Sequence, residues 1–392
     1  MSRMERRRRK NKKLRLRIIS ILFCVFGIGF FIFFRQGSKE ETWAIETKED
    51  EKKNEIKQEI KQEIKQEERR QEVEINQESK IQQEEKNVEI TISVAGDFTL
   101  GNYLPTDEYN TFDDVFRKQG ANYDYFLTNV KDIFKADDLT FVNLEGPLTN
   151  ANEKKDKPFP FRGDPSYVKI LTSGGVDVVH VANNHSHDYF EQGHQDTLQA
   201  LDQAGIGYCG YGHKYITEIR GIKVGVLGYK AWAKSAGLTK ILEDEIAYMK
   251  ERTDLLIVSF HWGEERTYYP NEIQKYYGHK AIDLGVDLVV GHHPHVIQGI
   301  EQYKDRYIVY SLGNFCYGGH RNPPDKDTFV FQQTFVFDKQ KQWLVKESNS
   351  NIIPCRISSV LDRNNYQPTP LEGTEKVKLI NRMEELSRPL SD

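Results

Sequence analysis

Short apolar runs alternate with segments of helical periodicity along residues 88–392. Continuous β-branched runs are typical of strands that are covered on both faces. The pattern predicts strands at residues 88–98, 139–144, 176–182, 223–229, 255–260, 286–290 and 307–312. It predicts helices between them, at residues 125–135, 165–172, 192–204, 240–252 and 272–284. This alternation indicates an α/β fold whose sheet contains parallel strands.

The end of the chain follows a different pattern. Residues 328–338 and 343–357 read as paired strands, and residues 375–386 as a charged helix. Roughly 300 residues after position 87 are enough to bury a full core. We therefore predict a main domain at 88–340 and a C-terminal strand and helix extension at 341–392.

The chain begins with a basic segment and an apolar one. Residues 1–17 carry ten Arg or Lys, and residues 18–34 carry no charge. Seventeen helical residues span roughly 26 Å, which is just enough to cross a bilayer. A cleaved signal peptide is the alternative, but the apolar run ends in Phe33, Phe34 and Arg35 without a cleavage site of small residues. We expect a single-pass anchor in the cell membrane, held by the lipid bilayer, with the N-terminus in the cytoplasm and the main domain extracellular.

Residues 35–87 are rich in Glu, Lys and Gln, and Glu-Ile-Lys-Gln repeats three times between 55 and 66. The repeat places Glu55 and Glu59 four residues apart, and a like-charged pair at that spacing mildly destabilises a helix. It also lacks the two apolar positions per heptad of a coiled coil. A solvated, partly helical spacer is the prediction, and a dimerising stalk is the alternative.

Composition excludes some functions for the expected extracellular domain. The formal net charge is −4, and the basic N-terminus conceals a more acidic exterior. No basic stripe with interleaved aromatic residues follows the spacer, so we expect no nucleic-acid partner. Cys24 lies in the apolar segment, and the other three cysteines, Cys209, Cys316 and Cys355, are scattered. Neither a disulfide framework nor a cysteine-based zinc site is indicated.

Polar side chains collect where the predicted strands end. In open α/β sheets this edge carries the ligand sites. Near residues 286–290, Gly291 would turn the backbone and present His292, His293 and His295. We expect the strand ends to bring together a carboxylate, an amide and several imidazoles that suit a mono- or dinuclear metal site. The expected metal ligands are Asp97, Glu145, Asn184, His261, His293 and His295. The ion would be Mn, Zn or Fe.

Roles beyond metal binding can also be assigned to these residues. The candidate catalytic residues are His185, His261 and Glu145, and the candidate substrate-binding residues are Arg162 and Asn314. Structural alternatives remain: Asp97 could cap a turn, Asn183 and Asn184 could satisfy loop backbone, and Arg162 could be a surface residue. His180 is expected in the core. A surface position is expected for His187, His194, His213, His279 and His320.

Six motifs occur in an order that resembles the poly-gamma-glutamate capsule synthesis protein family of the CapA or PgsA type. They lie at residues 96–97, 143–147, 183–188, 261–264, 291–296 and 311–315, within a resemblance over roughly 88–340. The resemblance implies a calcineurin-like metallophosphoesterase fold, with two packed sheets flanked by helices. It also implies poly-gamma-glutamate as the polymer, and a polyglutamate ligase and small membrane subunits as partners.

The chain departs from the wider metallophosphoesterase pattern at two ligand positions. That pattern begins Asp-x-His, and here Thr99 occupies the third position. Asn143 and Glu145 stand where the pattern has a bridging Asp, and the final Gly-His-x-His motif has one extra residue. Three hypotheses follow: a component of capsule polymer synthesis and export, a surface metallohydrolase acting on a phosphoester or on the amide-linked polymer, and a scaffold with a degenerate site.

Overall fold

The computed structural model describes residues 87–104, 108–338, 340–343 and 348–390, with scattered helical positions between 57 and 73. The chain divides into two units, Met1–Glu85 and Lys86–Asp392. The described positions of the first unit are helical and exposed. The predicted anchor at 18–34 lies outside the described residues. Among the helices that are described, none combines the length and the apolar composition needed to cross a membrane.

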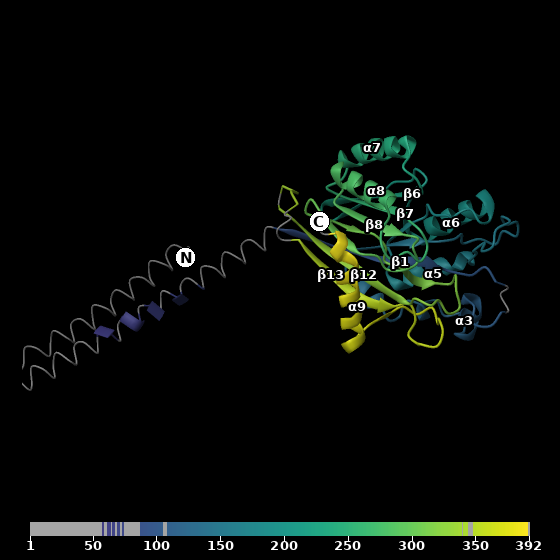
Figure 1. Cartoon of the computed structure of the whole chain (residues 1–392), viewed down its shortest axis with the longest axis horizontal. Helices are drawn as coiled ribbons and strands as arrows, with labels where there is room; N and C mark the ends of the chain where they lie inside the picture. Colours follow the sequence, from purple (N-terminus) through teal and green to yellow (C-terminus); the bar gives the residue numbers. More distant parts are fainter. Residues whose placement is uncertain are drawn as a thin grey trace, which may run out of the picture. The chain divides into compact units, whose positions relative to one another are not determined.

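Two sheets form the second unit (Figure 1). The first comprises β1 (Val88–Thr99), β2 (Leu139–Leu144), β3 (Val178–His180), β4 (Gly207–Cys209), β11 (Asn314–Tyr317), β12 (Asp327–Phe337), β13 (Asn349–Arg356) and β14 (Thr369–Pro370). Its order is β14-β13-β12-β1-β2-β3-β4, and β11 also pairs with β1. The second comprises β5 (Tyr215–Ile219), β6 (Ile222–Ala231), β7 (Leu255–Trp262), β8 (Leu288–His292), β9 (Ile300–Tyr303) and β10 (Arg306–Val309). Its order is β5-β6-β7-β8-β10-β9.

Parallel pairing runs through the middle of both sheets. It joins β1 to β2, β2 to β3 and β3 to β4 in the first sheet, and β6, β7, β8 and β10 in the second. The strands β12 and β13 pair antiparallel beside β1, so residues of the predicted C-terminal extension share the main sheet. Because the inner strands are parallel, their carboxyl ends lie at the same edge of each sheet.

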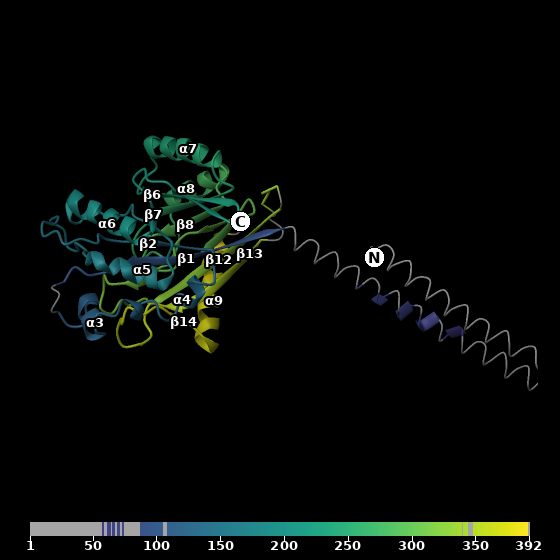
Figure 2. The same cartoon turned by 180° about the vertical axis from the view of Figure 1, so that it is seen from behind.

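Helices cover the outer faces of the two sheets (Figure 2). On the eight-stranded sheet they are α3 (Phe112–Lys118), α4 (Lys131–Phe134), α5 (Val168–Gly174) and α6 (Phe190–Ala204), with 3-10 turns at Tyr123–Tyr125 and Pro165–Tyr167. On the six-stranded sheet they are α7 (Ala236–Lys250) and α8 (Glu272–Asp283). The last helix, α9 (Gly373–Ser387), joins the core between the sheets and precedes a 3-10 turn at Arg388–Leu390. The predicted α/β class, with two packed sheets and flanking helices, is confirmed.

Three local predictions need correction. The segment 125–135 is not one helix: a 3-10 turn ends at Tyr125, and α4 begins only at Lys131. The predicted strand 307–312 ends at Val309, and β11 starts after Gly313. Gly291 does not turn the backbone but lies inside β8, where a Cβ would come within 2.3 Å of the Trp262 Nε1 atom.

Candidate metal site

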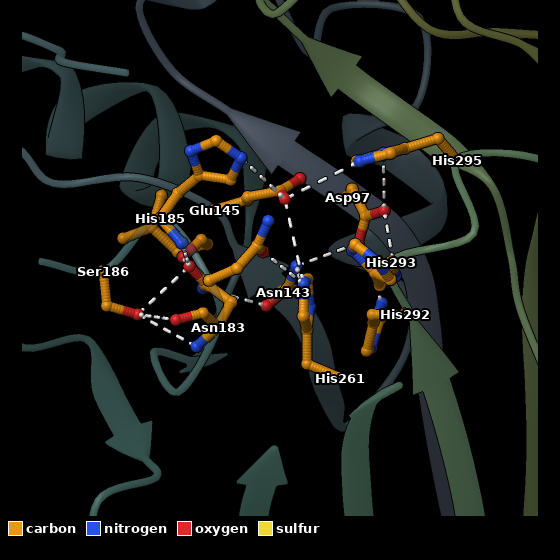
Figure 3. Close-up of polar contacts among 12 residues, drawn as sticks. Asp97, Asn143, Glu145, Asn183, His185, Ser186, His261, His292, His293 and His295 are labelled. Carbon is orange, nitrogen blue, oxygen red and sulfur yellow. Dashed lines mark hydrogen bonds and ion pairs between the residues drawn. The ribbon is translucent and has the colours of Figure 1, made fainter. Parts of the chain in front are cut away.

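Six candidate side chains from five strand ends meet at one edge of the two sheets (Figure 3). Asp97 lies near the end of β1, and Glu145 directly follows β2. His261 lies on β7, and His293 and His295 follow β8. His185 follows β3. The predicted convergence on one edge is therefore present in the fold.

Glu145 lies at the centre of the cluster. Its Oε1 atom is 3.9 Å from His185 Nε2, 3.8 Å from His261 Nε2 and 3.7 Å from His295 Nε2. The side chain is 1% exposed, and neither carboxylate oxygen has a hydrogen-bond partner among the described residues. A buried carboxylate without partners is costly, so this arrangement calls for a bound cation or donor.

Asp97 anchors the same cluster from the inner side. Its Oδ1 atom accepts a hydrogen bond of 2.9 Å from Asn143 Nδ2 and lies 3.3 Å from His292 Nδ1. Its Oδ2 atom lies 3.2 Å from His295 Nδ1. Gly96 allows this position, because a Cβ there would come within 2.0 Å of the Gly313 carbonyl oxygen. Asp97 is thus a fixed carboxylate rather than the cap of an exposed turn.

The loop after β8 has an unusual backbone. His293 and His295 have φ angles of 96° and 58°, a region that non-glycine residues occupy at a cost of about 1–3 kcal/mol each. His295 is held there by Asn314, whose Oδ1 lies 2.9 Å from His295 Nδ1 and whose Nδ2 donates to its carbonyl. Such strain at two neighbouring histidines is typical of a functional loop.

His185 is oriented from behind by a carboxylate. Its Nδ1 atom lies 2.7 Å from Asp188 Oδ2, which also accepts the Phe161 backbone N–H at 2.8 Å. Lys157 bonds the other oxygen of Asp188 at 2.7 Å, and the Phe161 ring stacks on His185 with ring centroids 4.1 Å apart. His185 therefore presents Nε2 toward Glu145 in a fixed ring orientation.

Two neighbouring asparagines have different roles. Asn183 is buried, and its Nδ2 atom donates to the Leu144 carbonyl at 2.8 Å. Asn184 is exposed, and its Oδ1 atom lies 2.7 Å from His261 Nε2. Asn183 therefore has the predicted structural role of bonding a backbone group of a loop. Asn184 is the one that contacts the cluster.

Of the two predicted substrate-binding residues, only Asn314 contacts the cluster, through His295. The Arg162 guanidinium donates to the Ala151 carbonyl at 2.8 Å and lies over the Tyr189 ring, with 5.3 Å from its central carbon to the ring centroid. The structure therefore gives Arg162 partners outside the cluster.

The family described as bacterial capsule synthesis protein PGA_cap matches residues 91–318, which include every candidate site residue. The chain belongs to the PGA_cap family. It is 29% identical over 341 residues to the capsule biosynthesis protein CapA of Bacillus anthracis, covering 76% of this chain and 77% of that protein. It is 32% identical over 250 residues to the PGA biosynthesis protein CapA of Bacillus subtilis (strain 168), covering 58% and 63%.

The comparison with solved structures is looser. The NAD nucleotidase NadN of Haemophilus influenzae overlaps this PGA_cap chain with a TM-score of 0.40 and 12% identity, covering 76% of this chain and 56% of that one. At this score the overlap carries no argument about activity.

The groups of this PGA_cap site shift one another's pKa values. Burial raises the pKa of Glu145 to about 8. Burial opposes the charge on His295, but Glu145 and Asp97 outweigh it and raise its pKa to about 10. Burial and the charge of His295 lower the pKa of His293 to about 3. Glu145 and His295 therefore both tend to hold a proton near neutral pH, and binding of a divalent cation there would release protons.

The donor set of the PGA_cap site fits a metal ion. Ligand atoms of Glu145, His293 and His295 all lie within 4.8 Å of one another. The His293 Nδ1 atom, like both Glu145 oxygens, is buried without a hydrogen-bond partner in the part of the chain that is described. These carboxylate and imidazole groups suit Mn, Zn or Fe.

Several contributors were not predicted. Asp188, Lys157 and His292 contact Asp97 or His185, although none was assigned a role from the sequence. The spacing of three residues between His185 and Asp188 was the available signal. The surface prediction for His194 was wrong, because this residue is 5% exposed and stacks on His187 with ring centroids 4.5 Å apart. His180 is fully buried, as expected, and its Nδ1 atom lies 2.7 Å from Ser259 Oγ.

Proposed function

We propose that this chain is a membrane-anchored component of poly-gamma-glutamate capsule synthesis and export. Its outer domain acts outside the membrane with a polyglutamate ligase and small membrane subunits. The family match and the names of the two Bacillus relatives support the pathway. The basic residues before the apolar segment support the anchor and its orientation. The observation that carries the proposal is the convergence of Asp97, Glu145 and His295 within the matched residues.

A second candidate is a surface metallohydrolase of calcineurin-like fold. The close ligand atoms of Glu145, His293 and His295, and the His185–Asp188 pair, favour it. A divalent ion held there by Asp97, Glu145, His293 and His295 would polarise a phosphoryl or carbonyl oxygen and lower the pKa of water. His185, fixed by Asp188, could then exchange a proton with a leaving group. Release of phosphate or of shorter polymer by the purified protein would distinguish this candidate.

The experiment replaces His261 and His295 by alanine, one at a time, in cells that make the polymer. Each change removes an imidazole beside Glu145, while the strands beneath stay packed. We expect loss of polymer and of metal bound to the purified full-length protein. His279→Ala is the matched control, because His279 lies on α8 and bonds Glu301 instead.

Normal polymer amounts in both site variants would contradict the proposal. Misfolding of both would favour a structural role for these histidines, and circular dichroism separates that outcome from a loss of function. In the same cells, protease added after removal of the wall should digest the chain beyond residue 38. Protection of the outer domain would contradict the proposed orientation.

A further inference from the structure

Trp232 is an exposed aromatic residue that contacts the candidate metal site. It directly follows β6 and is 43% exposed. The centroid of its ring lies 4.7 Å from that of His293 and 5.6 Å from that of His261, with interplanar angles of 74° and 89°. One part of the indole therefore packs on two site imidazoles, and the rest faces solvent beside them.

Trp232 differs in exposure from two other aromatic residues that contact the site. Phe161 stacks on His185 and is 4% exposed. The Tyr317 ring lies 5.2 Å from the His295 ring, and this residue is 9% exposed. Phe161 and Tyr317 are therefore enclosed packing groups, whereas Trp232 presents a free apolar surface.

The cluster is bordered by exposed residues at His261. Asn184 is exposed, and its Oδ1 atom lies 2.7 Å from His261 Nε2. Trp232 is also exposed and contacts the same imidazole. A ligand that approaches the cluster from this side would therefore meet the indole.

The segment after Trp232 is held in place by helices α7 and α8. The Tyr277 hydroxyl on α8 donates to the Ala233 carbonyl at 3.2 Å and accepts the Ser235 N–H at 2.9 Å. Ser235 caps α7, because its hydroxyl accepts the Leu238 N–H at 3.1 Å. The exposed indole therefore stands on an ordered support, which lowers the entropic cost of contact with a ligand.

A cation lies on the same side of the site. Lys230 pairs with His261 between β6 and β7, and its ammonium lies 4.8 Å from the centroid of the Tyr211 ring. The structure gives this half-buried ammonium no ion pair within the described chain. Its charge is therefore available to an anionic ligand.

An acidic residue lies beside a different part of the site. Glu265, in the loop after β7, raises the pKa of Glu145 and of His295. It is not among the groups that shift the pKa of His293, which packs on Trp232. The additional negative charge is therefore closer to His295 than to the indole.

We propose that Trp232 stacks on a planar ring of the ligand whose anionic group is held at the metal site, so that the site selects ring-bearing phosphoesters over bare anions. The flat face of an indole pairs favourably with another π system in an offset stack. The cation site and Lys230 account for the anionic group, and the free indole surface accounts for the ring. This inference rests on the metallohydrolase candidate, and it adds the class of leaving group.

The test compares phenylphosphonate with methylphosphonate, which share one anionic group and resist hydrolysis at the carbon–phosphorus bond. Each is titrated by calorimetry into the full-length protein in detergent, loaded with manganese. We expect phenylphosphonate to bind about tenfold more tightly, because its ring is stacked and removed from water. Cyclohexylphosphonate, whose ring is neither planar nor aromatic, should bind more weakly than phenylphosphonate.

Variants at one position assign the preference to the indole. Trp232→Ala should abolish the preference for phenylphosphonate, with methylphosphonate affinity and manganese content unchanged. Trp232→Phe should keep part of the preference, because a smaller ring still stacks. Tyr248→Ala removes an exposed ring on α7 and is the matched control, which should behave like the parent.

Equal binding of phenylphosphonate and methylphosphonate would overturn the inference, and so would a preference that survives in Trp232→Ala. Cyclohexylphosphonate that binds as tightly as phenylphosphonate would also overturn it, because simple apolar contact would then suffice. If Trp232→Ala loses manganese, the test falls to Trp232→Phe, which must show a reduced preference. Bound manganese without binding of any phosphonate would refute the metallohydrolase candidate itself, whereas binding without preference refutes only the role of Trp232.

Discussion

The two edges of the parallel strands are built from different chemistry. At the amino-terminal edge, an aspartate stands immediately before each of four strands: Asp138 before β2, Asp177 before β3, Asp254 before β7 and Asp287 before β8. At the carboxyl-terminal edge, Asp97 and Glu145 lie among imidazoles and amides. Of these four aspartates, only Asp287 is buried. A buried carboxylate among imidazoles gives the carboxyl-terminal edge the composition of a ligand site.

The aspartates repeat one hydrogen-bonding arrangement. Asp287 Oδ2 accepts the Leu256 N–H at 2.9 Å, and the Asp287 N–H donates to the Leu256 carbonyl at 2.9 Å. Asp177 does the same with Thr140, at 2.7 Å and 3.1 Å. Each aspartate therefore closes the first rung of the ladder between its own strand and the neighbour. The role is structural, because backbone groups of the protein supply the partners.

At the carboxyl-terminal edge, Asp97 accepts a hydrogen bond from Asn143, but Glu145 has no such partner among the described residues. Both Glu145 oxygens and His293 Nδ1 are buried with no hydrogen bond to any described residue. Native proteins rarely leave buried polar atoms unpaired. The comparison therefore separates carboxylates whose oxygens accept backbone N–H groups from Glu145, whose oxygens have no hydrogen-bond partner among the described residues.

The largest expected effect comes from Glu145→Gln. Glutamine keeps the shape of the side chain and removes its charge, so a metal ligand is lost. We expect metal affinity of the full-length protein to fall by about 100-fold or more, because the loss of a group that only orients a ligand already costs about 10- to 100-fold. Metal content after dialysis measures this. A chelator should lower the thermal midpoint of the unmodified protein and leave that of the variant unchanged.

The thermal midpoint of Glu145→Gln measured in chelator tests whether Glu145 also stabilises the fold. Because neither Glu145 oxygen has a hydrogen-bond partner among the described residues, we expect its replacement to cost the fold only its attraction to the His295 imidazole. A variant that binds metal normally, or that unfolds well below the chelator-treated parent, would place Glu145 with the structural carboxylates.

A smaller effect, on stability alone, is expected for Asp287→Ala at the opposite edge. This residue is 5% exposed, and its loss leaves the Leu256 N–H buried without an acceptor. An unpaired buried donor costs about 1–3 kcal/mol of unfolding free energy. Urea denaturation measures the loss. Polymer made per folded molecule should match that of the parent.

Asp287→Asn is the control, because its side-chain oxygen can still accept the Leu256 N–H, and it should lose less. The distinction between the two edges would fail if Asp287→Ala made less polymer per folded molecule than the parent. It would also fail if Asp287→Ala were as stable as the parent.

The difference between the edges was only partly predictable from sequence. Strand interiors and the His-rich loop were found because β-branched runs and clustered imidazoles are local signals. The convergence of Asp97, Glu145 and His261 followed from the rule that parallel strands end at one edge. The part played by His292 was missed, because β8 continues through Gly291 and the strand's length depends on pairing with β7.

The last expected effect concerns pH and lies at the amino-terminal edge. Asp137 directly precedes Asp138, the aspartate before β2. The Asp137 carboxylate accepts the Thr140 hydroxyl at 2.7 Å. Burial, and to a lesser extent the charges of Asp177 and Asp138, raise its pKa to about 7. Between its ordinary pKa near 4 and pH 7, the unfolded chain releases this proton while the folded chain retains it. The contribution of Asp137 to the free energy of unfolding must therefore fall as pH rises through that window.

Asp137→Asn removes that contribution, because an amide does not titrate and its oxygen can still accept from Thr140. We expect the variant to gain stability over the parent as pH rises from about 4 to 7, with a constant difference above that range. Urea denaturation at several pH values, read as the difference between the two proteins, measures this. A difference that is constant across the whole range would mean that Asp137 ionises normally. In that case the amino-terminal edge would consist of satisfied carboxylates throughout, and the contrast with Glu145 would be complete.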